Sequence, residues 1–256
     1  LSGSKFFGLG SVAVSHDDKF LAYTVDLKGS EYYDIFVRNL LTHEIVDERI
    51  KNTSGAISWS LDSKSFFYTP LDKYHRSKKI YKHIVGKLSK QDEFIFEEKE
   101  KPFSVGISLT SDEKFFVIST SDSNTDEEYF FSANEEKIKI QLFQSRKKGI
   151  KYSIDSWQGF WYMHTNQDAP DYQILRCNHQ NYKNLKIFIP PRNEIIIGGL
   201  EFLDNYILRT EKSDAIPKLF FREINTNIEE EIIISKEPVG SPGFSLIQKT
   251  LTHLLL

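Results

Sequence analysis

The sequence predicts an all-β fold, an incomplete β-propeller with about five recognisable four-stranded blades. One observation is a repeat of 43–50 residues, described below. Another is the aromatic share of 14%, with 20 Phe and 12 Tyr, which suits pleated, half-buried strands. In addition, no stretch keeps the i, i+3, i+4, i+7 apolar stripe of an amphipathic helix over three turns. The rival interpretation, a β-sandwich with irregular loops, does not require a long repeat.

The repeat is a hydroxyl-x-Asp-x-Lys turn followed by an aromatic and β-branched run. Clear copies begin at Ser15, Ser60 and Thr110, and weaker ones at Asp155 and Asp204. Successive marker aspartates are 45, 50, 43 and 49 residues apart. The short Asp side chain can bond its own backbone two residues on, which favours a tight turn, and the run that follows is typical of a buried strand. Four strands in such a period is the spacing of propeller blades.

The remaining strands follow from apolar and β-branched runs between the turns. They are expected at residues 32–38, 45–50, 56–59, 79–84, 137–143, 184–189, 218–224 and 230–234. This places the blades roughly at residues 9–54, 55–104, 105–149, 150–197 and 198–235.

Residues 236–256 form an irregular tail in which the turn-and-strand pattern is lost. This abrupt loss motivates the hypothesis of a truncated or frameshifted gene product. An open arc of blades exposes apolar flanks that a closed ring would bury, so we expect the isolated chain to self-associate through them.

Composition excludes several classes of protein. The 256 residues suit one large domain or two small ones, and 39% hydrophobic with 27% charged residues is ordinary for a soluble globular protein. With 33 Lys and Arg against 36 Asp and Glu, no basic excess favours nucleic acid. The single Cys177 excludes an internal disulfide framework, and no apolar run reaches the roughly 18 residues of a membrane helix. Residues 1–10 lack a secretory signal, so a cytoplasmic location is expected.

No catalytic triad is predicted within the chain. The nearest approach to the Gly-x-Ser-x-Gly nucleophile elbow is residues 243–247, which lack the second glycine. No Asp and then His follow in a plausible order, because His253 is only eight residues beyond Ser245.

No metal site is predicted either. The histidines show no His-x-x-x-His spacing and are interpreted as turn or surface residues. They are His16, His43, His75, His83, His164, His179 and His253. Residues 122–126 resemble the opening of a calcium loop, but Glu127 and Ala133 occupy the positions that need glycine and a bidentate glutamate.

Three further strings are weighed and set aside, so no cofactor is predicted. Residues 8–13 form a broken glycine fingerprint that leads into a strand rather than a helix. Asn52 begins a glycosylation sequon that is expected to be a turn. Trp157 and Trp161 are expected to pack between blades rather than to stack a ligand. The residues alone therefore leave two classes, a binding or gating propeller and the non-catalytic part of an enzyme.

Specific strings resemble the propeller of the oligopeptidase B group, also called protease II, of the prolyl oligopeptidase family of serine peptidases. The match runs in order over roughly residues 8–235. Its strings are residues 10–15, 21–26, 52–55, 59–60, 67–72, 76, 79–83, 86, 149–153, 165–168 and 199–202.

The resemblance implies a seven-bladed propeller over an α/β-hydrolase domain, in which the propeller gates access so that short peptides enter. It also implies cleavage after Arg or Lys. The family's nucleophile, Asp and His belong to the hydrolase domain, which has no counterpart here, so we expect the chain alone to be inactive. The alternative is a stand-alone propeller that serves as a protein-interaction scaffold.

Overall fold

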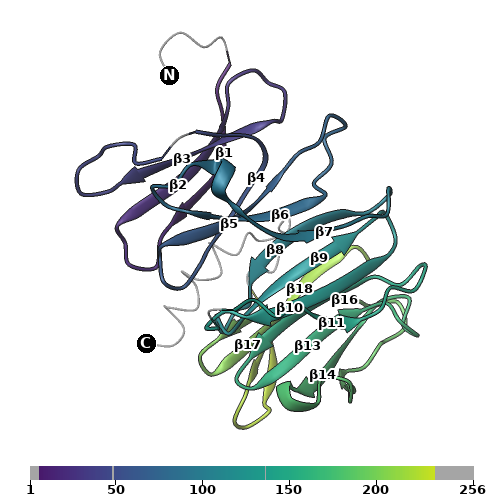
Figure 1. Ribbon diagram of the computed structural model, residues 1–256. Coiled ribbons are helices and arrows are strands. Elements are labelled where there is room, and N and C mark those ends of the chain that lie inside the picture. The colour runs from purple at the N-terminus through teal and green to yellow at the C-terminus, as the bar shows by residue number, and fades with distance from the viewer. Residues whose placement is uncertain (1–5, 48, 136, 234–256) are drawn as a thin grey trace. The chain divides into compact units, whose positions relative to one another are not determined.

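The computed structural model describes residues 6–47, 49–135 and 137–233, and nineteen strands run through them as successive antiparallel meanders. The first sheet has seven strands in chain order. They are β1 (Gly8–Val14), β2 (Phe20–Asp26), β3 (Tyr33–Asn39), β4 (Ile50–Trp59), β5 (Ser65–Pro70), β6 (Lys79–Ile84) and β7 (Glu93–Glu97), purple to blue in Figure 1.

Three four-stranded sheets follow, and the described residues hold only two helices, both one-turn 3-10 helices, η1 (Ser89–Gln91) and η2 (His179–Asn181). The second sheet contains β8 (Ser104–Leu109), β9 (Phe115–Ser121), β10 (Asp126–Ser132) and β11 (Gln141–Gln144). The third contains β12 (Tyr152–Trp157), β13 (Phe160–Thr165), β14 (Gln173–Asn178) and β15 (Lys186–Ile189). The fourth contains β16 (Ile196–Leu203), β17 (Tyr206–Ser213), β18 (Ile216–Glu223) and β19 (Glu229–Ile232).

The seven-stranded sheet is two four-stranded groups that share β4. The start of β4 pairs with β3, and its end pairs with β5. Between them the chain turns through Asn52 and Gly55, whose φ angles are +58° and +88°. A Cβ on Gly55 would meet the ring of Tyr33 at 3.0 Å. Both the positive φ and this close contact therefore favour glycine at position 55. The strands therefore group in fours throughout, and the fold is the predicted incomplete propeller.

Apolar clusters fill the space between successive groups of strands. The first is built around Ile35, Trp59 and Phe66, and the second around Phe67, Val105 and Phe116. Cross-strand aromatic pairs reinforce the sheets, as Tyr23 and Phe36 do with ring centroids 5.5 Å apart. Trp161 is fully buried among Phe115, Phe130 and Phe143, so it packs as expected.

The chain divides into two compact units. The first comprises residues 1–163 with 177–184, and the second comprises residues 164–176 with 185–256. The second unit has a small core in which Leu208 and Leu219 are buried. No helix in the described part of the chain is long and apolar enough to cross a membrane.

Several expected strands are displaced. The described residues of 45–50 do not form a separate strand, because Ile45 makes an isolated bridge with Arg38 and β4 begins at Ile50. The strand expected at 137–143 begins only at Gln141. Asn52 lies inside β4 rather than in a loop, although its positive φ gives the chain the expected local turn. The irregular tail from residue 236 lies outside the described residues.

Candidate functional site: ion clusters and turns of the propeller

The repeated turns are structural elements that link one blade to the next. In the first turn Ser15 Oγ donates to Asp17 Oδ1 at 2.8 Å, and Asp17 accepts the backbone N–H of Lys19 at 3.2 Å. The Lys19 ammonium, 3.0 Å from Asp17 Oδ2, and the bond from Ser15 lower the pKa of Asp17 to about 2. The backbone N–H of Asp17 then donates to Ser63 Oγ in the second turn, at 3.0 Å. The hydroxyl and Asp side chains of the repeat therefore stabilise the fold rather than take part in a reaction.

The second and third sheets are joined by the same kind of contact. Ser156 Oγ donates to Asp112 Oδ2 at 2.9 Å, and the backbone N–H of Ser111 donates to Asp155 Oδ1 at 2.8 Å. Asp112 and Asp155 are the third and fourth marker aspartates of the repeat. The carboxylate of the weak fourth copy thus binds the preceding turn.

His83 on β6 is fully buried between two carboxylates. Its Nδ1 lies 2.7 Å from Asp92 Oδ1, and its Nε2 lies 3.4 Å from Asp47 Oδ2. Tyr68 donates its hydroxyl to the other oxygen of Asp92 at 2.8 Å. Burial acts to lower the pKa of His83, but the contacts with Asp47 and Asp92 outweigh it and raise the pKa to about 9. His83 is therefore a buried imidazolium at neutral pH.

Arg146 forms a second buried cluster with two glutamates. Its Nη2 donates to Glu98 Oε2 at 2.6 Å and to Glu127 Oε1 at 2.9 Å. The guanidinium carbon lies 3.9 Å from the centre of the Phe103 ring. Burial acts to lower the pKa of Arg146, but the two carboxylates raise it further above its ordinary value. Arg146 thereby joins the segment after β7 to the segment after β11.

Glu128 on β10 is a buried carboxyl with no cation beside it in the described structure. Ser119 Oγ donates to its Oε2 at 2.8 Å. Burial raises the pKa of Glu128 well above its ordinary value, and the neighbouring Asp126 adds to the effect. Folding therefore disfavours the ionised form of this carboxyl.

The second unit has its own cluster around Arg209. The guanidinium donates two parallel bonds to Glu229, at 2.7 and 2.8 Å, and one to Glu211 at 2.7 Å. Arg192 donates to the same carboxylate of Glu211. Each of these ion clusters holds strands or loops together.

The histidines do not converge. His16, His43 and His75 are exposed, as the sequence interpretation required. The assignment of His83 to a turn or surface was wrong, because its carboxylate partners allow a charged side chain to be buried. His164 and His179 are half-buried in β13 and η2. Within the described ranges, no group of three or more His, Cys, Asp or Glu side chains forms a metal site.

The other weighed residues have local roles. Asp122 caps its own turn by accepting the backbone N–H groups of Asn124 and Thr125, at 2.8 and 2.7 Å. Gly8 and Gly10 lie in β1, as expected of a string that leads into a strand. Trp157 is half-buried at the end of β12. Residues 243–247 and His253 lie outside the described residues.

Sequence reasoning missed the ion clusters. The partners of His83 lie 36 residues before it and 9 after it, in segments without strand character. The signal available was a histidine within a segment expected to be a strand. The run of three acids at residues 126–128 carried a similar signal, since consecutive carboxylates in a strand must place at least one of them toward the interior.

Comparison with known proteins gives a consistent result. The family model described as "Prolyl oligopeptidase, N-terminal beta-propeller domain" matches residues 2–246. "Dipeptidyl aminopeptidase BI" of Pseudoxanthomonas mexicana is 26% identical over 99% of this chain and 35% of its own length. "Protease 2" of Moraxella lacunata is 29% identical over 72% of this chain and 29% of its own length.

Solved structures agree on the fold. Oligopeptidase B of Leishmania major covers 93% of this chain with a TM-score of 0.87 and 19% identity, over 35% of its own length. Oligopeptidase B of Trypanosoma brucei gives 0.83 with 21% identity, over 93% of this chain and 34% of its own length. The chain thus spans about a third of the relatives that it matches. It belongs to the prolyl oligopeptidase family and corresponds to that family's N-terminal β-propeller domain.

Proposed function

We propose that this chain is the substrate-gating propeller of an oligopeptidase B-like serine peptidase that cleaves short peptides after Arg or Lys. The match of the family's propeller domain to residues 2–246 carries the proposal. The similarity to a protein named Protease 2 supports the oligopeptidase B branch. The Arg and Lys preference rests on the family resemblance, because no specificity pocket is identified among the blades.

Hydrolysis is assigned to an α/β-hydrolase domain and not to the residues of this chain. Peptide hydrolysis by this family needs a nucleophile activated by a neighbouring base, and the described clusters are ion pairs that join strands and loops. We therefore assign no catalytic, cofactor or metal-binding residue to the chain. Short peptides are its proposed ligands, and the cytoplasm is its proposed location.

The blade limits proposed from the repeat are residues 9–54, 55–104, 105–149, 150–197 and 198–235. Grouping the strands in fours supports them, because β4, β8, β12 and β16 each contain or closely follow a proposed limit. The first limit differs from the others because it falls within a strand shared by two blades. The continuous β4 is the outer strand of one blade and the inner strand of the next.

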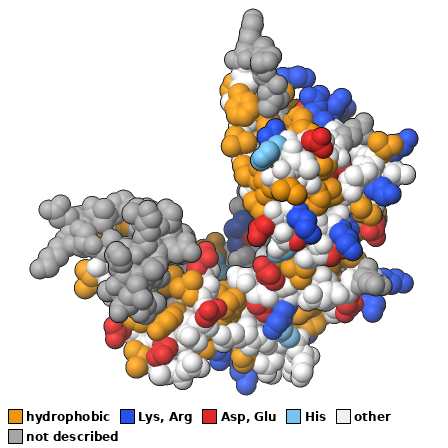
Figure 2. Space-filling view, turned by 90° about the vertical axis from the view of Figure 1, so that its left-hand side faces the viewer, with side chains coloured by type: hydrophobic (Ala, Val, Ile, Leu, Met, Phe, Trp, Pro, Cys, Tyr) orange, Lys and Arg blue, Asp and Glu red, His pale blue; other side chains and the backbone are white. Residues whose placement is uncertain are grey.

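The flank of the first blade is the proposed self-association surface. Leu9, Val12 and Val14 of β1 are 55%, 55% and 48% exposed, and Phe6 and Phe7 precede them at 46% and 57%. Figure 2 shows hydrophobic side chains gathered on this part of the first unit. Contiguous exposed apolar surface of this kind favours association. We expect Val12→Lys to shift the sedimentation profile toward monomer, whereas Leu41→Lys, at an 87% exposed loop position, leaves it unchanged.

The test of function uses the native protein, recovered from source cells with an antibody against this chain. Short peptides with a single Arg or Lys should be cleaved after that residue, while the same sequence within a folded protein stays intact. Loss of activity after treatment with a covalent serine-hydrolase inhibitor is the accompanying control. Cleavage of the folded substrate at a comparable rate would contradict gating, and absence of any cleavage would contradict the peptidase assignment.

A further inference from the structure

One edge of the first unit concentrates positive charge. Three loops with their adjoining strand ends form it, and we call them the lysine rim: residues 72–79 between β5 and β6, residues 97–103 from the end of β7, and residues 144–151 from the end of β11. Together they hold ten Lys and Arg side chains against four Asp and Glu. The whole chain has a net charge of −3, so the remainder of the sequence is distinctly acidic. Such a separation of charge creates a local potential that attracts anionic partners.

Side chains tie the three loops of the rim to one another. Arg146 of the third loop donates to Glu98 of the second at 2.6 Å and covers the Phe103 ring. Lys78 of the first loop donates to the carbonyl oxygens of Glu100 and Lys101 in the second, at 2.5 and 3.1 Å. It also donates to the carbonyl oxygen of Phe103. The loops are therefore held in fixed relative positions.

The first loop is also organised internally, by Asp72. Its carboxylate accepts the backbone N–H of Tyr74 at 2.7 Å and binds the Arg76 guanidinium at 2.9 and 3.1 Å. Tyr32 donates its hydroxyl to the Asp72 carbonyl at 2.9 Å. This arrangement presents Tyr74, which is 63% exposed, with the Lys73 ammonium 5.0 Å from its ring centre. A preordered loop loses little conformational entropy when it binds.

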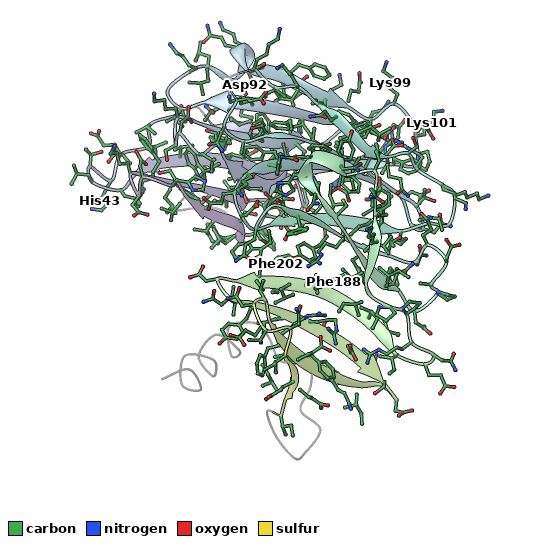
Figure 3. All side chains as sticks on the ribbon, turned by 90° about the horizontal axis from the view of Figure 1, so that it is seen from below. His43, Asp92, Lys99, Lys101, Phe188 and Phe202 are labelled. Carbon is green, nitrogen blue, oxygen red and sulfur yellow. The ribbon has the colours of Figure 1, made fainter. Side chains whose placement is uncertain are left out.

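Five lysines of the rim are exposed and have no ion-pair partner among the residues that the structure describes. They are Lys73, Lys99, Lys101, Lys147 and Lys148. Other cations of the rim are already paired, Arg76 with Asp72, Lys79 with Glu97 and Lys151 with Asp126. Figure 3 labels Lys99 and Lys101, which lie close together at the edge of the ribbon and point outward. The rim thus offers several uncompensated ammonium groups from a fixed backbone.

We propose that the lysine rim is a docking surface for an acidic polypeptide segment, a carboxylate-rich stretch of a partner chain. Glu97 and Glu100 lie between the lysines and are exposed. A nucleic-acid backbone, charged at every residue, would meet these carboxylates, whereas a peptide can place neutral residues against them. A single tyrosine already flanked by cations also offers no row of aromatic rings on which bases could stack.

The test measures binding of a fluorescein-labelled decaglutamate peptide to the whole chain by fluorescence anisotropy at low ionic strength. The variant replaces Lys99, Lys101, Lys147 and Lys148 with Ala. The matched control replaces four exposed lysines elsewhere in the first unit with Ala, namely Lys51, Lys64, Lys87 and Lys90. Both variants lose four positive charges. A difference in their binding therefore reflects where the lysines lie and not the net charge of the chain. Circular dichroism melts verify that both remain folded.

We expect the rim variant to bind decaglutamate at least about tenfold more weakly than the unaltered chain, and the control variant to bind within about twofold of it. Raising the salt concentration should weaken binding of the unaltered chain. Three results overturn the proposal: no binding at low salt, equal loss in both variants, or tighter binding of a labelled ten-nucleotide oligothymidylate than of decaglutamate.

Discussion

His83 lies between Asp47 and Asp92 with all three side chains buried, its Nδ1 2.7 Å from one carboxylate and its Nε2 3.4 Å from the other. Asp92 is labelled in Figure 3. Asp47 follows β3, and its Oδ1 also accepts the backbone N–H of Gly86 beyond β6. One imidazolium therefore fixes two connecting segments of the first sheet against β6.

Replacing His83 should destabilise the protein strongly. His83→Asn leaves two buried carboxylates without their cation, and breaking a buried ion pair in this way costs about 3–5 kcal/mol. Urea unfolding followed by tryptophan fluorescence measures the change. His43→Asn is the matched control, because His43 is exposed and has a positive φ that Asn tolerates. Equal and small effects of the two substitutions would contradict the role given to His83.

The same group predicts how stability depends on pH. The pKa of His83 is about 9 in the folded protein, against an ordinary value of 6.5. A raised pKa means that folding favours the protonated form, so the contribution is complete below about pH 6.5 and is lost as the pH rises through about 9. The urea midpoint should fall between pH 6 and pH 9.5, and His83→Asn should remove most of that fall. A fall that persists in the variant would assign the effect to other groups.

Replacing Arg146 should destabilise the folded protein far more than replacing the neighbouring Lys147. Arg146→Ala leaves Glu98 and Glu127 buried without a cation and removes the contact with Phe103, at a cost of about 3–5 kcal/mol. Lys147→Ala changes an exposed neighbour and should alter the free energy of unfolding by less than about 0.5 kcal/mol. Chemical denaturation of both variants checks this. A similar small loss in both would show that the cluster contributes little.

Glu128 predicts a stabilising substitution. Burial raises the pKa of this carboxyl, so the folded state disfavours its ionisation and loses stability as the pH rises above the ordinary range of a glutamate. Glu128→Gln keeps the shape and removes the ionisation, and it should raise the melting temperature at pH 8 more than at pH 5. Glu135→Gln, at an exposed position, should change neither value. A lower melting temperature for Glu128→Gln at pH 8 would contradict the assignment.

Two glycines in the first strands of their sheets differ in whether neighbouring atoms leave room for a Cβ. A Cβ at Gly198 in β16 would lie 2.8 Å from the backbone oxygen of Thr210 and closer still to its hydroxyl. Gly198→Ala should therefore cost about 1–3 kcal/mol through overpacking. Gly106 in β8 has no atom within 4 Å of such a Cβ, so Gly106→Ala should be neutral or stabilising by about 0.4–1 kcal/mol. Thermal melts of the two variants compare them directly, and equal losses would contradict this account.

The fold was largely predictable from the sequence because its turns are local. The hydroxyl, Asp and Lys of each of the three clear copies lie within five residues, and the bonds from Ser15 and Lys19 to the Asp17 carboxylate form within that span. The separate strand expected at residues 45–50 was predicted wrongly, because its apolar pattern resembles a strand while, of the described residues there, only Ile45 and Ile50 pair with β3. Strand pairing depends on the partner as well as on the segment.

The buried clusters could not be predicted in the same way. Arg146 lies 48 residues from Glu98 and 19 from Glu127, and only the folded sheets bring the three together. From sequence alone, a charged residue is expected to be exposed unless its ion-pair partner is known. The expectation that no catalytic, cofactor or metal residue lies in the chain remains a prediction.

The mass of the native product in source-cell extract tests the central claim most directly. An immunoblot with an antibody raised against this chain measures it. The account predicts a species well above the 29.8 kDa of the chain, in which the propeller is joined to a hydrolase domain. A sole product of 29.8 kDa without arginyl-peptide cleavage would contradict the claim that this chain gates a peptidase.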